Sequence, residues 1–153
     1  METGKVDEAI EHYPRALALN PDYSEACNNL GEALTGKGLV KEAIAEFEKA
    51  VRLDPGYVVA HANLGVVFGR SGQTDKAIFH LRKVVEGKPD AADARSNLAQ
   101  ALAEKRDFRE ASLQLEEAVR LSAGRDPVAL FLLGRIYAEL GRSAIACSRT
   151  TRH

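Results

Sequence analysis

The chain has 153 residues, of which 45% are apolar and 28% are charged, and its net charge at pH 7 is −1. This length suits one domain of ordinary size, and the balanced charge removes the simplest reason to expect a nucleic acid or an anionic membrane as partner. No apolar run approaches the roughly 20 residues that cross a bilayer. Cys27 and Cys147 have no partner spacing, so we expect neither a disulfide framework nor a zinc site.

A period of 34 residues runs along most of the chain. Prolines, asparagines and alanines recur at this step. The positions are Pro21, Pro55 and Pro89; Asn29, Asn63 and Asn97; and Ala9, Ala43, Ala77 and Ala111. Such a period is typical of one supersecondary unit that is stacked repeatedly along an axis.

Apolar residues within each unit recur at helical spacing, as Cys27, Leu30, Gly31 and Leu34 do. Turn sequences lie within units, as Gly-Lys-Gly at 36–38, and between units, as Asn-Pro-Asp at 20–22. Each unit is therefore predicted as a helix A followed by an antiparallel helix B. In chain order the predicted helices are 7–19, 25–37, 41–53, 59–71, 75–86, 93–105, 109–121 and 128–140.

The predicted array occupies residues 1–141. It consists of a partial repeat 1–23, the repeats 24–57, 58–91 and 92–126, and a partial repeat 127–141, followed by an irregular or partly helical tail over 142–153. The first unit is expected to hold only a turn and helix B, whose Ile10 and Leu17 would face no partner helix. At the other end, Gly141 matches the turn residue Gly72, so a helix B is expected to follow it, but the helical pattern does not continue. Because repeat arrays need covered ends, either the chain is a fragment of a longer protein or its ends self-associate.

Several of the repeated residues resemble the tetratricopeptide repeat. They are Asn-Leu-Gly at 29–31 and 63–65, Ala43 and Ala77, Phe47, and Pro55 and Pro89. The resemblance implies an all-α fold, an α-solenoid of antiparallel helix pairs that forms a right-handed superhelix, with a concave groove of A helices that binds peptides or proteins. Gly31, Gly65 and Gly134 on the A helices are expected to let two helices approach closely.

No pattern of catalytic or metal-binding residues occurs in the sequence. The four histidines lack the spacing of a metal-binding motif, and neither a phosphate loop nor a nucleophile elbow is present. His61 takes the position of Cys27 in its repeat, which predicts a packing residue with its polar edge at the rim. We therefore expect no enzyme, no cofactor and no metal site.

Function is expected on the face of each helix A that lies opposite its apolar stripe. The predicted groove residues are Glu25, Asn29, Glu32, Val59, Asn63, Val66, Arg70, Asp93, Asn97, Gln100, Phe131 and Arg135. The asparagine column resembles the ladder in the superhelical arm of O-linked N-acetylglucosamine transferases, although asparagine is also common at this place in the family. The carboxylate clamp of chaperone-binding members is absent, since Asn28 and Ala62 replace its basic residues. The groove face carries more acidic than basic residues, which favours a neutral or basic ligand.

The leading hypothesis is a non-catalytic scaffold that holds an extended protein or peptide segment in the groove of the A helices. The alternative is a substrate-recognition arm of a larger multidomain enzyme, such as a glycosyltransferase, of which this chain is a fragment. A third interpretation is a self-assembling array that associates through its uncapped ends. We expect no nucleic acid and no membrane as partner, and a cytoplasmic location.

Overall fold

The computed structural model describes the backbone of residues 3–150 and the side chains of residues 4–141. Eight α-helices and no strand occur in residues 3–150, which confirms the predicted all-α class. The helices are α1 (Thr3–Leu19), α2 (Ser24–Gly36), α3 (Val40–Leu53), α4 (Val58–Arg70), α5 (Thr74–Gly87), α6 (Ala92–Glu104), α7 (Phe108–Leu121) and α8 (Pro127–Thr150). Every helix predicted from the 34-residue period is present.

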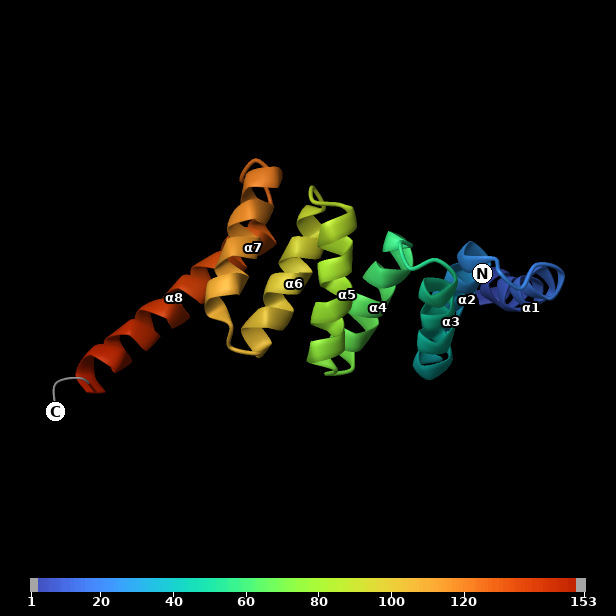
Figure 1. Cartoon of the computed structure of the whole chain (residues 1–153), viewed down its shortest axis with the longest axis horizontal. Helices are drawn as coiled ribbons and strands as arrows, with labels where there is room; N and C mark the ends of the chain where they lie inside the picture. Colours follow the sequence, from blue (N-terminus) through green and yellow to red (C-terminus); the bar gives the residue numbers. More distant parts are fainter. Residues whose placement is uncertain (1–2, 151–153) are drawn as a thin grey trace.

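The helices follow one another in a single row, from α1 at one end to α8 at the other (Figure 1). Each helix packs on its neighbours in the chain, and the A helices α2, α4, α6 and α8 also contact each other in sequence. Within residues 3–150 the B helices α3, α5 and α7 make no such contact with one another. The A helices therefore lie closer together, so the solenoid curves around them and its concave side is the A-helix side.

Small residues set the distance between the two helices of a repeat. Ala43, Ala77 and Ala111, one on each complete helix B, are fully buried. On the A helices, a Cβ atom added to Gly31 would lie 2.6 Å from Cε1 of Phe47, and one added to Gly65 would lie 2.7 Å from Cγ of Leu81. Real Cβ atoms do not approach so closely, so glycine is required at both positions at this helix separation.

Gly134 does not share this role, although it matches Gly65 in sequence. A Cβ atom added to Gly134 would have no described atom within 4 Å, because no large side chain of a following helix B is placed against it. The prediction of a close approach at Gly134 is therefore wrong for this structure.

The two end helices are longer than the period predicts. α1 begins at Thr3 and includes Gly4, where a turn is expected, and α8 continues past Gly141 to Thr150. A helix tolerates one glycine at a cost of about 1 kcal/mol, so a glycine in the turn column does not by itself end a helix. Leu17 of α1 is buried in the core against α2, so it does have a partner, and Ile10 is partly buried.

Three glycine-to-alanine variants test the close approach. We expect Gly31→Ala and Gly65→Ala each to lower the free energy of unfolding by about 1–3 kcal/mol, because the added methyl group overpacks the contact with Phe47 or Leu81. Gly134→Ala is the matched control and should raise that free energy by about 0.5–1 kcal/mol, since alanine is the better helix former. Chemical denaturation measures all three, and equal effects at the three sites would contradict the packing described here.

Candidate functional site

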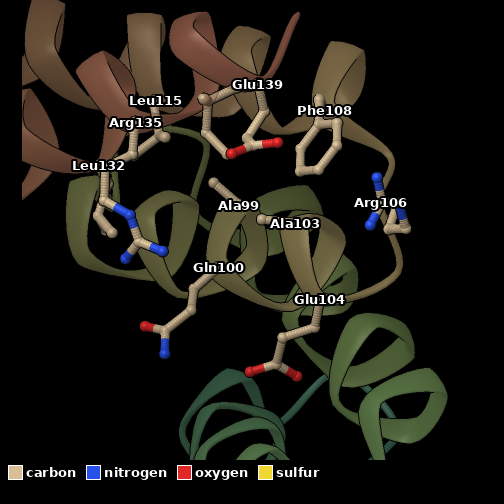
Figure 2. Close-up of a pocket in the computed structure, with 11 residues that line it drawn as sticks. Ala99, Gln100, Ala103, Glu104, Arg106, Phe108, Leu115, Leu132, Arg135 and Glu139 are labelled. Carbon is tan, nitrogen blue, oxygen red and sulfur yellow. The ribbon is translucent and has the colours of Figure 1, made fainter. Parts of the chain in front are cut away.

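Two hollows open on the concave side of the solenoid. One lies between α4, α5 and α6 and has a volume of about 250 Å³. The other lies between α6, α7 and α8 and has a volume of about 540 Å³ (Figure 2). Gln100 and Glu104 line both hollows, so the two adjoin along α6. We call them the α4–α6 hollow and the α6–α8 hollow.

The two hollows occupy the same place in consecutive repeats. Their walls are built from residues that match each other in the repeat register. The matched pairs are Gly65 and Ala99, Gly69 and Ala103, Leu81 and Leu115, Asn97 and Leu132, and Gln100 and Arg135. In the repeat before them, the larger ring of Phe47 stands where Leu81 and Leu115 stand, directly against Gly31.

The α6–α8 hollow has an apolar floor and a charged rim. Ala99 and Ala103 of α6 form part of its floor, and Leu132 of α8 lies to one side (Figure 2). Glu104 and Arg135 stand at the rim (Figure 2). A concave apolar surface with a few polar groups around it is the usual form of a binding site for an apolar group of a ligand.

Arg106 and Phe108 complete the wall of this hollow, and neither residue is among the groove residues predicted from the sequence. Arg106 has a φ of +62°, in the left-handed region that Gly38 and Gly72 occupy at the matching turns. Its guanidinium lies 5.6 Å from the ring centroid of Phe108, which takes the position of Thr74 in the preceding repeat. The signal for both is a departure from the repeat pattern, which a comparison of matching columns reveals.

The structure brings together five of the twelve predicted groove residues at the hollows. Val66, Arg70, Asn97 and Gln100 line the α4–α6 hollow, and Gln100 and Arg135 line the α6–α8 hollow. The other seven line neither hollow. Of these, Glu25, Glu32, Val59, Asp93 and Phe131 are exposed, whereas Asn29 and Asn63 are partly buried.

The three asparagines of the predicted ladder have different surroundings. The Asn63 amide nitrogen donates to Oδ1 of the buried Asn28 at 2.9 Å and to Oε1 of Glu32 at 3.0 Å, so it joins α4 to α2. Asn28 also donates to Oε1 of Glu32 at 3.0 Å. Asn97 is exposed, and its amide has no hydrogen-bond partner among the described side chains, because Ala62 and Val66 stand where Asn28 and Glu32 stand one repeat earlier. Asn29 accepts from Nδ2 of Asn28 at 3.5 Å, so Asn29 and Asn97, unlike Asn63, donate no amide hydrogen to a described group.

The α2 end of the concave side is acidic. Glu25 and Glu32 are both exposed there, and burial together with these two carboxylates raises the pKa of the Tyr57 hydroxyl. Arg70 of the next helix A is exposed and forms no ion pair within the described part of the chain. The A-helix side therefore carries acidic residues on α2 and again on α6, at Asp93 and Glu104, with the basic Arg70 of α4 between them.

A histidine pair lies apart from the hollows. His61 is buried, its Nε2 donates to the Pro55 carbonyl at 3.1 Å, and its Nδ1 lies 2.9 Å from Nδ1 of His80, which then donates. In the next repeat Arg95 and Gln114 occupy the matching positions, and Arg95 bonds to the Pro89 carbonyl and to Gln114 in the same way. This column therefore ties helix A to its turn and to helix B, which is a structural role.

Acid should weaken this tie. Burial, together with the proximity of His61 and Lys76, lowers the pKa of His80 to about 4, below the ordinary 6.5. The unfolded chain therefore binds more protons than the folded chain between these values, so the free energy of unfolding falls as the pH drops from about 6.5 to 4. His80→Gln, which copies Gln114, should show a smaller fall over that range in thermal denaturation. An unchanged pH dependence would show that protonation of His80 does not cause the loss of stability.

The difference between Asn63 and Asn97 is testable through stability. Asn63→Ala leaves the buried Asn28 oxygen without its donor and should lower the free energy of unfolding by about 1 kcal/mol or more. Asn97→Ala removes no bond and should be neutral or slightly stabilising, because alanine favours helix. Urea denaturation of the two variants side by side makes the measurement, and equal losses would show that the bonds to Asn28 and Glu32 contribute nothing.

Two further findings concern the described residues. None of the described helices is long and apolar enough to cross a membrane. Residues 4–141 contain no cluster of three or more histidine, cysteine, aspartate or glutamate side chains arranged to hold a metal ion.

Solved structures of helical repeat proteins resemble this fold closely. MamA from Desulfovibrio magneticus RS-1 aligns with a TM-score of 0.82 at 22% identity, over 97% of this chain and 84% of that one. YrrB, a TPR protein with an unusual peptide-binding site, aligns with a TM-score of 0.82 at 26% identity, over 90% of this chain and 71% of that one. The first TPR of Spaghetti (RPAP3), bound to the HSP90 peptide SRMEEVD, aligns with a TM-score of 0.72 at 20% identity, over 77% and 93%.

Sequence comparisons point to the same family. A search of curated proteins finds no match. A family model of the tetratricopeptide repeat matches residues 1–58 and 97–146, and two further models with the same description match residues 70–121 and 46–79. Since the first model alone covers more than half of the sequence, the chain belongs to the tetratricopeptide repeat family.

Proposed function

We propose that this chain is a non-catalytic scaffold that binds an extended peptide or protein segment along the concave A-helix side. One observation carries the proposal. Two adjoining hollows open on that side, and the exposed amides of Asn97 and Gln100 stand beside them without a hydrogen-bond partner among the described side chains. The hollows can accommodate apolar side chains of a ligand, and the amides of Asn97 and Gln100 can form hydrogen bonds with its backbone.

The two amides supply the polar part of the recognition. Asn97 and Gln100 are three residues apart on α6, so they project from the same face of the helix. Each primary amide offers two donors and one acceptor, which is enough to pair with both groups of a peptide bond. Asn63 has a different role, because its amide hydrogens are donated to Asn28 and Glu32. These bonds join α4 to α2 and hold the groove wall in place.

The charge of the groove favours a neutral or basic ligand. Glu25 and Glu32 make the α2 end acidic, and Asn28 and Ala62 stand where members that capture acidic tails carry basic residues. Acidic peptides would meet repulsion at that end. YrrB, which is 26% identical to this chain and is described as having a peptide-binding site, supports peptide binding as the activity of this fold.

A binding experiment tests the proposal directly. A peptide array of neutral, basic and acidic sequences of about twelve residues identifies binders, and fluorescence anisotropy then measures their affinity. We expect the double variant Asn97→Ala, Gln100→Ala to bind the best peptide about tenfold more weakly or worse, since each lost amide bond contributes about 0.5–1.5 kcal/mol.

Asn20→Ala is the matched control, because Asn20 is an exposed amide in the turn between α1 and α2 and lines neither hollow. It should bind as the parent does, and circular dichroism should give the same helical spectrum for all variants. Equal affinity of the double variant and the parent would place recognition outside the α6 face. A complete lack of binding on the array would count against the scaffold function.

A further inference from the structure

The spacing of the two hollows restricts the conformation of a ligand, provided that the proposed groove function holds. The hollows are one repeat apart, with α6 between them, and α6 contacts both α4 and α8. Axes of packed helices lie about 8–10 Å apart, so equivalent points in consecutive repeats are separated by about this distance. A ligand that fills both hollows must present two side chains at that interval on one side.

Polyproline II geometry meets this requirement. It rises about 3.1 Å per residue with three residues per turn, so side chains at i and i+3 point the same way about 9 Å apart. In a β-strand, side chains on one face are about 6.6 Å apart at i+2 and about 13 Å apart at i+4. The lower value is too short and the higher value is too long for hollows one repeat apart.

The repeat before the hollows presents a carboxylate at the corresponding place. Glu32 takes the position that Val66 and Gln100 hold in the next two repeats, and it is exposed. Phe47 replaces the leucine of the hollow wall, so this position offers charge where the others offer apolar space. Glu25 on the same helix adds to the negative charge.

We propose that the groove reads one ligand residue in every three in polyproline II conformation: a basic residue at α2, then an apolar residue in each of the two hollows. The motif is basic-x-x-apolar-x-x-apolar from the α2 end towards α8, in either chain direction. Asn97 and Gln100 lie between the two apolar positions and bond the intervening backbone. Recognition therefore follows the 34-residue period of the protein.

A set of fluorescent peptides with an alanine–proline background tests the register. Two leucines are placed two, three, four or five residues apart, with or without an arginine three residues beyond either one. We expect the three-residue spacing to bind about tenfold more tightly than the others, since burial of one leucine side chain is worth that factor or more. Arginine should add affinity that disappears in Glu32→Gln and at high salt.

Two filling variants assign each leucine to a hollow. Gly69→Leu fills the α4–α6 hollow and Ala103→Leu fills the α6–α8 hollow, because each residue lines only that one. Each variant should abolish the effect of replacing one leucine of the peptide by alanine and should leave the effect of the other intact. Ala45→Leu is the control, since Ala45 is exposed on α3 and matches Leu113 in the repeat register.

The outcomes separate this inference from the groove function. If peptides bind with no preference for the three-residue spacing, or if both filling variants keep the parent's selectivity, the register is wrong while the groove function stands. If binding does require Asn97 and Gln100 but the two leucines act at another spacing, the polyproline II conformation is wrong. If none of these peptides and no array peptide binds, both proposals are wrong.

Discussion

The close approach of helix A to helix B is the constraint on which the rest of the structure depends. Glycine at 31 and 65 lets the side chains of Phe47 and Leu81 lie where a Cβ atom would otherwise stand. The fully buried alanines of the B helices are also small, so they allow the same close approach from the side of helix B. The third complete repeat has the small Ala99 in the same column. With a small residue at this contact in each repeat, the units stack with one period into a curved row.

The residue that makes this contact from helix B differs between the repeats. The wall residue that packs against helix A is Phe47 in one repeat and a leucine, Leu81 or Leu115, in the next two. Leu81 lines the α4–α6 hollow and Leu115 lines the α6–α8 hollow. Repeats of one fold can therefore differ in the side chain that they place on this wall.

The period predicted the helices well because it reports local apolar spacing, which determines which residues of each helix face the core. It failed at Gly4 and Gly141, where a single glycine matches a turn position but the helix continues. It also failed to distinguish Asn63 from Asn97, since a helical wheel treats one helix at a time. Their difference arises from Asn28 and Glu32 in the preceding repeat, and only the stacked structure places these groups together.

The α6–α8 hollow collects the departures from the repeat pattern. Ala99 stands where the earlier A helices have glycine, and Leu132 stands in the asparagine column. Arg106 adopts the left-handed conformation that glycine adopts at Gly38 and Gly72, although a residue with a side chain is strained there by about 1–2 kcal/mol. Ala123, in the turn between α7 and α8, has a φ of +52° and lines neither hollow. The left-handed conformation therefore belongs to the turns that end α6 and α7, and at Arg106 it places a guanidinium on the wall of the α6–α8 hollow.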